Sequence, residues 1–158
     1  MTSTSTASAA IRAATSTDLA AIERLLVANG LPTDGVGDAL GSFLVAEHAG
    51  ALVGVVGVEK AADYGLLRST AVDASWRSRG LGRRLVERAI AAAEGKGLKA
   101  LYLLTTTAER YFPSFGFALT SRDEVPEAIR RTGEFQGACP ASAVVMVRPS
   151  ESSTSQPS

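Results

Sequence analysis

Two glycines and four arginines lie close together between Val72 and Arg84, in a segment that reads V-D-A-S-W-R-S-R-G-L-G-R-R. This segment joins an apolar, strand-like run to a long amphipathic pattern that predicts a helix. The first N–H groups of a helix lack partners within the helix, and Gly80 and Gly82 have no side chain to obstruct a ligand that approaches them. Cationic side chains surround the glycines at Arg77, Arg79, Arg83 and Arg84. We therefore predict that this turn binds a phosphate or pyrophosphate group.

Two common phosphate-binding motifs do not fit this turn. A P-loop requires Gly-Lys-Ser or Gly-Lys-Thr, which does not occur in the chain. The dinucleotide-binding fingerprint requires a third glycine after Gly82, where Arg84 and Leu85 stand instead. What remains is Arg77-x-x-Gly80-x-Gly82 between a strand and a helix. The alternative interpretation is an ordinary helix N-terminus with surface arginines.

Charged residues are unevenly distributed along the chain. Its 158 residues include 16 basic and 16 acidic side chains, so the net charge is zero. Residues 77–88 hold five arginines and one glutamate, a local charge of +4, and the rest of the chain carries −4. A neutral chain with 6% aromatic residues does not fit a nucleic-acid-binding domain, which is strongly basic or offers stacking platforms. A compact cationic segment fits a small polyanionic ligand instead.

Single cysteine and histidine residues limit the metal and redox chemistry. Cys139 has no second cysteine for an internal disulfide, and His48, beside a turn, has no second histidine, so no metal site is expected. We interpret Cys139 as a packed loop residue, with an arsenic ligand or nucleophile as the alternative. The longest apolar run, Ala51 to Val58, is far shorter than the ~18 residues of a membrane span. With no secretory signal pattern, the expected location is cytoplasmic, without a membrane partner.

Strand-like and helix-like segments alternate along the chain, which is typical of an α/β domain. Strands are predicted at 10–14, 43–47, 51–59, 64–72, 99–105, 117–120 and 142–147, with a hairpin turn at Ala49–Gly50. Helices are predicted after the capping residues 15–18, over 80–94, before Gly116 and over 126–131. The apolar face of the helix over 80–94 comprises Leu81, Leu85, Val86, Ala89, Ile90 and Ala93. We expect one domain over residues 11–148, between disordered tails at 1–10 and 149–158.

The turn and its neighbours resemble the GNAT acetyltransferases. Arg77-x-x-Gly80-x-Gly82 is similar to that superfamily's acetyl-CoA pyrophosphate motif, and Leu66–Val72 lies where its central strand lies. The segment that ends in Gly116-Phe117 is similar to its short helix ending in Gly-Phe. The resemblance covers residues 11–148. It implies the GNAT fold, a mixed twisted sheet of about six to seven strands flanked by helices, with acetyl-CoA as cosubstrate and no metal.

Three further segments resemble the arsenic-resistance N-acetyltransferase branch of this superfamily. They are 65–69 (GLLRS), 103–108 (LLTTTA), and 132–135 (TGEF) with 139–143 (CPASA). This resemblance implies an N-acetyltransferase whose acceptor is a small amino-acid-like amine, such as an arsenical of the arsinothricin type. The alternatives are another acceptor (an antibiotic, a polyamine or a protein N-terminus) or a non-catalytic acyl-CoA-binding module. Because many family members pair, we expect a homodimer by analogy.

The resemblance also implies which residues bind the cofactor. They are Ala71, Val72, Arg77, Arg79, Gly80, Leu81, Gly82, Arg83, Thr105 and Phe112. A backbone N–H near Val72 would stabilise the negative charge that develops on the thioester carbonyl oxygen. Two positions depart from the family's pattern, because Thr105 stands where Asn is common and Phe112 where Tyr is often assigned as general acid. Phe cannot donate a proton, which leaves the adjacent Tyr111 as the candidate acid.

Glu59 is the candidate general base. It ends the apolar run 51–58, next to the predicted central strand. An α-amino group has a pKa of about 7.7–8.0, so part of it is neutral near pH 7 and a base is helpful rather than essential. The thiol leaving group titrates at roughly 8.5 and needs little help from an acid. The alternative interpretation of Glu59 is a solvated strand-end carboxylate.

Arg68 is the candidate substrate-binding residue. Strand alternation predicts that Leu66, Arg68, Thr70 and Val72 share one face of the strand. An arginine within an apolar strand requires a partner, and its planar fork suits a carboxylate, arsinic or phosphinic group of the acceptor. Thr70 and Phe135 are the other residues predicted to line the acceptor site. The alternative is an internal ion pair of Arg68 with Glu59 or Asp63.

Replacement of Gly82 by Val tests the position of the anion-binding turn. The branched side chain would block the approach of a pyrophosphate to the backbone, so Gly82→Val should abolish the binding of CoA. Isothermal titration calorimetry with CoA measures this directly. Unchanged affinity would contradict the prediction that the pyrophosphate lies at this turn.

Overall fold

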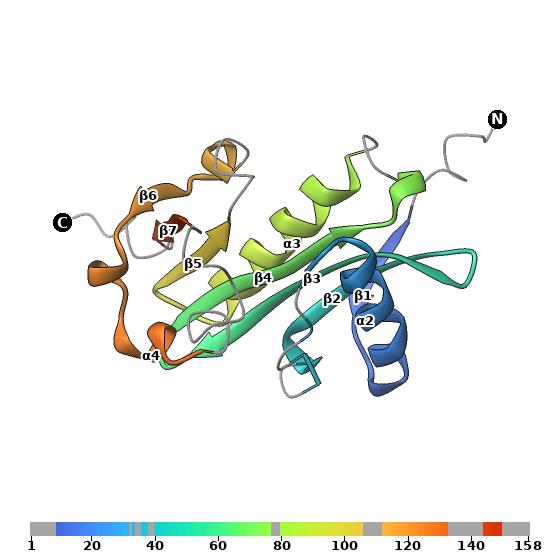
Figure 1. Ribbon diagram of the computed structural model, residues 1–158, viewed down its shortest axis with the longest axis horizontal. Coiled ribbons are helices and arrows are strands. Elements are labelled where there is room, and N and C mark those ends of the chain that lie inside the picture. The colour runs from blue at the N-terminus through green and yellow to red at the C-terminus, as the bar shows by residue number, and fades with distance from the viewer. Residues whose placement is uncertain are drawn as a thin grey trace. The chain divides into compact units, whose positions relative to one another are not determined.

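The computed structural model of the protein describes residues 9–31, 33, 36–37, 40–76, 80–105, 112–132 and 144–149 (Figure 1). Residue contacts divide the chain into two compact units. The first comprises Met1–Gly57 and Ser69–Val86, and the second comprises Val58–Arg68 and Glu87–Ser158. The prediction of one domain over 11–148 remains an expectation.

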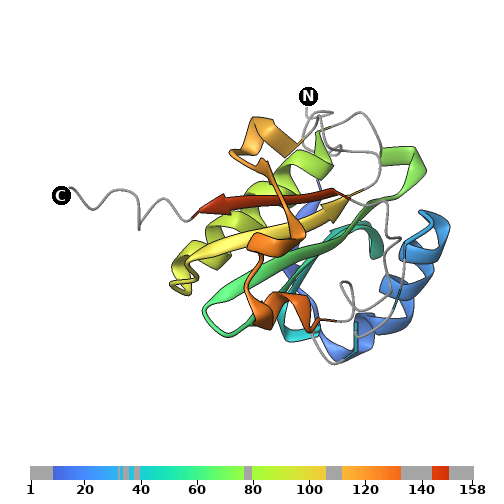
Figure 2. The same cartoon turned by 60° about the vertical axis from the view of Figure 1, so that its left-hand side comes forward.

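Among the described residues, seven strands form a mixed sheet, which confirms the predicted α/β fold class. They are β1 (Ala10–Ala13), β2 (Phe43–His48), β3 (Ala51–Ala61), β4 (Tyr64–Val72), β5 (Ala100–Thr105), β6 (Ala118–Thr120) and β7 (Val144–Pro149). Their order in the sheet is β1-β2-β3-β4-β5-β7-β6. The β4–β5 pair is parallel, whereas β1–β2, β2–β3, β5–β7 and β6–β7 are antiparallel. Strand β7 therefore lies between β5 and β6, and Figure 2 shows it running alongside β5.

The helices begin and end near the predicted residues. The α-helices are α2 (Leu19–Ala28), α3 (Leu81–Gly95) and α4 (Glu127–Arg130). Short 3-10 helices are η1 (Ser16–Asp18), η2 (Leu40–Ser42), η3 (Ala74–Trp76), η4 (Phe112–Phe115) and η5 (Arg122–Glu124). All six residues of the predicted apolar face of α3 are buried. The predicted hairpin turn is confirmed, because Ala49 and Gly50 both have positive φ, of 54° and 81°.

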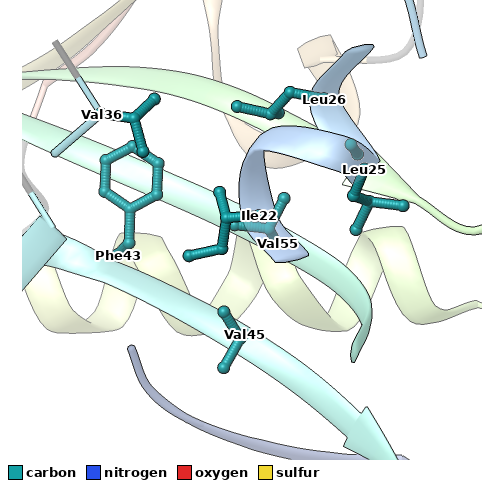
Figure 3. Packing of buried hydrophobic residues seen from close by; sticks show 8 residues of the cluster. Ile22, Leu25, Leu26, Val36, Phe43, Val45 and Val55 are labelled. Atoms are coloured by element: carbon teal, nitrogen blue, oxygen red, sulfur yellow. The ribbon is translucent and has the colours of Figure 1, made fainter. Parts of the chain in front are cut away.

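In the first unit, α2 and the start of α3 lie on opposite faces of the β2–β3 ribbon. Val45 pairs with Val55, and both pack with Ile22 and Leu26 of α2 in one apolar cluster (Figure 3). The next pair in the register, Ala46 with Gly54, faces the other way because successive strand residues alternate. A Cβ atom at Gly54 would lie 2.8 Å from Leu85 Cδ1 and 3.2 Å from Leu81 Cδ2. The absence of a side chain at residue 54 thus lets α3 approach the strand backbone.

The second unit has its own apolar cluster. Leu66 of β4 packs there with Ala100 and Tyr102 of β5, and Ile129 of α4 covers them. The register pairs Leu66 with Tyr102, and Tyr102 contacts Tyr64 edge-on with ring centroids 6.0 Å apart. These contacts fix α4 on one face of the parallel β4–β5 pair.

Ser69 interrupts the regular alternation of β4. Its φ of 60° lies in the left-handed region that residues other than glycine rarely adopt. A residue in this conformation inside a strand turns the backbone, so side chains before and after it do not follow a continuous period of two. The prediction that Leu66, Arg68, Thr70 and Val72 share one face was therefore wrong, since it assumed an uninterrupted strand.

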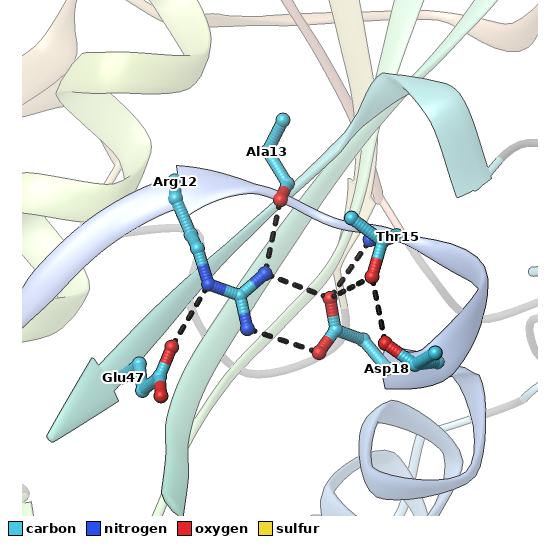
Figure 4. A network of polar contacts seen from close by, with 6 residues as sticks. Arg12, Ala13, Thr15, Asp18 and Glu47 are labelled. Atoms are coloured by element: carbon cyan, nitrogen blue, oxygen red, sulfur yellow. Dashed lines mark hydrogen bonds and ion pairs between the residues drawn. The ribbon is translucent and has the colours of Figure 1, made fainter. Parts of the chain in front are cut away.

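A network of charges with the buried carboxylate of Asp18 at its centre closes the connection between β1 and α2 (Figure 4). The Arg12 guanidinium donates to both carboxylate oxygens of Asp18, at 2.8 and 3.0 Å, and to Oε1 of Glu47 at 2.9 Å. Asp18 Oδ2 also accepts a hydrogen bond from the backbone N–H of Thr15, at 2.8 Å. Arg12 holds the pKa of the Asp18 carboxyl far below its usual range, mainly through its hydrogen bond and then through Thr15 N–H. The predicted capping segment 15–18 thus acts through Asp18, whose side chain is buried.

Replacement of Asp18 by Asn should lower the free energy of unfolding by about 1.5–3 kcal/mol at pH 7, the usual range for hydrogen bonds to charged groups. Because the pKa of Asp18 is lower in the folded protein, its contribution is present above the unfolded pKa of about 3.9 and is lost as the pH falls toward the folded pKa. The difference between wild type and Asp18→Asn should therefore shrink below pH 4. Urea denaturation at pH 7 and pH 3.5 measures it.

Asp63→Asn is the matched control for Asp18→Asn. The Asp63 carboxylate is 71% exposed and lies 3.8 Å from Lys99 Nζ, so its loss should change stability by less than about 0.5 kcal/mol. A cost of Asp18→Asn that did not depend on pH, or that matched the control, would contradict the role of the buried carboxylate.

Candidate anion-binding turn and acceptor residues

The start of α3 has the backbone geometry that the sequence predicts for an anion site. Gly80 has a φ of 82° and is exposed, and a Cβ atom there would meet nothing within 4 Å among the described residues. The first bond of the helix runs from Arg84 N–H to Gly80 O, at 3.1 Å. The N–H groups of Leu81 and Gly82 therefore precede the helix's own hydrogen-bond ladder, which places partial positive charge at this end.

Leu81 and Arg84 anchor this helix start within the first unit. Leu81 is 2% exposed and lies against Gly54 of β3. Arg84 is exposed, and its Nη2 donates to the carbonyl of Ala9 at 3.2 Å. Arg83 is exposed as well. No local sequence pattern indicates the contact between Arg84 and Ala9, because the two residues lie far apart in the chain.

The segment between β4 and α3 is fixed to the β2–β3 hairpin. Asp73 N–H donates to Val53 O at 2.8 Å, and the Asp73 carboxylate accepts from the backbone N–H of Ser75 at 3.0 Å. Trp76 is buried, and its ring lies 5.0 Å from that of His48. Trp76 is therefore a packing residue beside the hairpin. His48 is half-buried, and its ring contact was not predicted.

Several predicted cofactor residues of the first unit are adjacent in the chain and are described. Ala71 is 3% exposed and belongs to the cluster under α2, and Val72, the last residue of β4, is half-buried. Thr70 is half-buried also. The oxyanion role of the Val72 backbone remains a prediction.

Arg68 and Glu59 form an ion pair in the second unit. Arg68 Nη1 lies 3.1 Å from Glu59 Oε1, and the side chains are 1% and 26% exposed. This is the internal pair that the sequence left open as an alternative for Arg68. The pair joins the two residues predicted to act on the acceptor, with the carboxylate reaching solvent and the guanidinium buried behind it. The roles of Arg68 in substrate binding and of Glu59 as base remain predictions.

Phe112 lies in an aromatic group of the second unit. It is buried, and its ring centroid lies 5.7 Å from that of Phe117 and 6.3 Å from that of Phe115. Thr105, the last residue of β5, is half-buried and pairs with Val144. Other predicted residues lie outside the described residues: Arg77, Arg79, Tyr111, Phe135 and Cys139.

Each unit has a cavity that is lined by described residues. One of about 570 Å³ lies in the first unit, between α2 and the β2–β3 hairpin, and has Arg24, Glu47 and Asp73 in its wall. The other, of about 410 Å³, lies in the second unit between α3 and η4. No group of three or more His, Cys, Asp or Glu side chains suited to a metal occurs among the residues that the structure describes. In that same part of the chain, no helix has both the length and the apolar character of a membrane span.

The mixed sheet contains a parallel β4–β5 pair, and α3, which follows β4 in the chain, begins directly after the exposed Gly80. Both features agree with the fold that the sequence resemblance implies. Residues 39–119, just over half of the chain, match the acetyltransferase (GNAT) domain family. The chain belongs to this family.

Curated relatives and solved structures agree with this membership. The chain is 33% identical over 94 residues to an amino-acid acetyltransferase of Neisseria meningitidis, which covers 58% of this chain and 22% of that protein. The chain therefore spans about a fifth of the length of the curated relatives that it matches. N-acetylglutamate synthase from Neisseria gonorrhoeae, complexed with coenzyme A and N-acetyl-glutamate, has a TM-score of 0.77 at 28% identity and covers 90% of this chain and 35% of that one. A Mycobacterium tuberculosis protein in complex with CoA shares the fold, with a TM-score of 0.76, 23% identity and coverage of 89% and 98%.

Removal of either member of the Glu59–Arg68 pair should destabilise the protein. We expect Arg68→Ala to cost about 3 kcal/mol, the lower end for a buried pair, because Glu59 keeps a quarter of its side chain in solvent. Glu59→Gln should cost less, since an amide oxygen still accepts from Arg68. In a double-mutant cycle followed by urea denaturation, the coupling should be about 1–3 kcal/mol. Additive costs would show that the pair contributes no coupling.

Proposed function

We propose that this protein transfers an acetyl group from acetyl-CoA to the amine of a small amino-acid-like acceptor. The observation that carries the proposal is the start of α3, where exposed Gly80 precedes backbone N–H groups in a chain of the acetyltransferase family. A pyrophosphate at this position would accept hydrogen bonds from the N–H groups and face the helix dipole. The structure of the similar Neisseria gonorrhoeae enzyme with coenzyme A supports acetyl-CoA as the cosubstrate.

The cofactor residues that we propose follow the turn. Gly80, Leu81 and Gly82 would bind the pyrophosphate through their backbone, and Arg77, Arg79 and Arg83 would add positive charge. Ala71, Val72, Thr105 and Phe112 would bind the remainder of the cofactor. The hydroxyl of Thr105 can donate one hydrogen bond, fewer than the amide of the Asn that is common at this position in the family.

The reaction that we propose is direct attack of the neutral amine on the thioester carbonyl. A C–N bond forms, the C–S bond breaks, and CoA leaves as a thiolate. The amine loses a proton, which Glu59 accepts directly or which passes to solvent. The Val72 N–H would stabilise the carbonyl oxygen, and binding both substrates in the correct orientation would supply much of the acceleration. Tyr111 is the candidate proton donor to the thiolate, which needs little assistance.

The acceptor that we favour carries an anionic group as well as an amine. Arg68 is the proposed ligand of that group, beside Thr70 and Phe135, and its ion pair with Glu59 supports a polar acceptor site. The amino-acid acetyltransferases among the relatives support an amino-acid-like acceptor. The resemblance to the arsenic-resistance branch makes an arsinothricin-type compound the first acceptor to test. A cytoplasmic homodimer, with one domain over residues 11–148, is the form we propose.

Thiol release from acetyl-CoA, measured with a panel of amines, tests this function. The panel should contain amino acids, arsinothricin, polyamines, aminoglycosides and an N-terminal peptide. We expect turnover with small amino-acid-like amines and a rate that rises with pH as a larger fraction of the amine becomes neutral. Turnover confined to another amine class would contradict the acceptor. If the protein bound CoA but acetylated no amine, the proposed enzymatic function would be wrong, and a non-catalytic acyl-CoA-binding module would be favoured.

A further inference from the structure

We propose that Arg148 of β7 is a positioning residue that holds the turn η4 in the conformation required for acetyl-CoA binding. This inference rests on the proposed function, since Phe112 in η4 is one of the predicted cofactor residues. Nothing in the sequence pattern distinguished Arg148, which follows the last predicted strand. Arg148 and the three residues considered with it, Glu94, Phe115 and Gly116, all belong to the second unit.

The Arg148 guanidinium joins two separate elements. Its Nε donates to the carbonyl of Phe115 at 2.7 Å, and its Nη1 donates to Glu94 Oε2 at 2.6 Å. Phe115 is the last residue of η4, so the first bond places a positive charge at the carbonyl end of that helix. Glu94 lies in the last turn of α3. The side chains of Arg148 and Glu94 are 13% and 28% exposed, so this ion pair is shielded from solvent more than a surface pair.

Gly116 allows this arrangement. Its φ is 94°, and a Cβ atom there would lie 3.2 Å from Arg148 Nε, closer than side chains usually pack. The Gly116 N–H donates to Pro113 O at 3.0 Å, which closes the turn. Two physical reasons therefore favour glycine at residue 116. They are its positive φ and the Arg148 guanidinium that lies against it.

The position of η4 determines the position of Phe112. The ring of Phe112 contacts the rings of Phe115 and Phe117, which are the residues before and after Gly116 in the chain. Phe117 N–H also donates to Phe112 O, at 3.4 Å. A change at the carbonyl of Phe115 is thus transmitted to Phe112 over one short turn.

Arg148 also forms part of the wall of the 410 Å³ cavity in this unit. Ile90 of α3 and Ser114, Phe115 and Gly116 of the turn complete the wall, together with Glu87. This space lies beside η4, so close packing alone does not determine the position of the turn. The hydrogen bond and ion pair of Arg148 hold the turn on the side of this cavity.

Arg148→Met, which retains most of the apolar stem, is the test. We expect the dissociation constant for CoA, measured by calorimetry, and the KM for acetyl-CoA to rise about 5- to 10-fold. The acceptor KM and the kcat at saturating acetyl-CoA should stay within about twofold of wild type. Arg148→Lys should restore part of the affinity, because an ammonium keeps the charge but lacks the fork that reaches both Phe115 and Glu94.

The matched control is Arg131→Met in the same unit. Arg131 pairs with Glu127 at 3.0 Å, but both side chains are exposed, at 76% and 68%. This variant should leave the CoA affinity unchanged. Hydrogen exchange at the amides of Gly116 and Phe117 should be faster in Arg148→Met and unchanged in the control, which would not follow from a uniform loss of stability.

The outcomes separate this inference from the proposed function. If wild type binds CoA and Arg148→Met binds it with equal affinity, the positioning role is wrong and the proposed function stands. The positioning role would also be wrong if the KM values for acetyl-CoA and for the acceptor rose in parallel, or if Arg148→Met and Arg131→Met had equal effects. Either result would indicate a merely structural role. If wild type binds no CoA, the proposed function fails and this inference fails with it.

Discussion

Close contact between α3 and the backbone of β3 is the constraint on which the candidate anion site depends. Gly54 leaves room for Leu81 and Leu85, so the first two turns of the helix lie directly on the strand. Ala46, paired with Gly54 in the register, keeps the same face small. Because Leu81 is both the first residue of the helix and a buried anchor, the N–H groups that follow Gly80 are held in place by packing rather than by a ligand. A larger residue at 54 would lift the helix and displace that site.

Partly buried ion pairs form a second kind of constraint. Arg12 with Asp18, Arg68 with Glu59 and Arg148 with Glu94 each place a guanidinium against a carboxylate. In the part of the chain that the structure describes, no buried side-chain nitrogen or oxygen lacks a hydrogen-bond partner. Since the cost of an unpaired buried charge exceeds the gain from most single contacts, these pairs fix which segments lie together. Two of the three involve residues for which we propose functional roles.

The Glu59–Arg68 pair changes how the acceptor chemistry is understood. The sequence presented Arg68 as a ligand for a substrate anion or as a partner of an internal carboxylate. With the guanidinium buried and the carboxylate partly exposed, Glu59 is the member that reaches solvent. An acceptor amine would meet Glu59 first, while its anionic group would compete with Glu59 for Arg68. Both assignments therefore depend on the same ion pair.

The sequence by itself determined the order of the strands and helices along the chain, the buried face of α3, the hairpin at Ala49–Gly50 and the turn at Gly80. These features depend on local periodicity and on residues with special backbone freedom. Both signals are visible in a single amino-acid sequence. Only the tertiary structure decided the partners of Arg12, Arg68 and Arg148, the left-handed Ser69 that interrupts β4, and the place of β7 between β5 and β6. The physical reason is that ion pairs and neighbouring strands join residues that are distant in the chain. No local pattern encodes which of several carboxylates an arginine will contact, or which strand will lie beside another, in the folded protein.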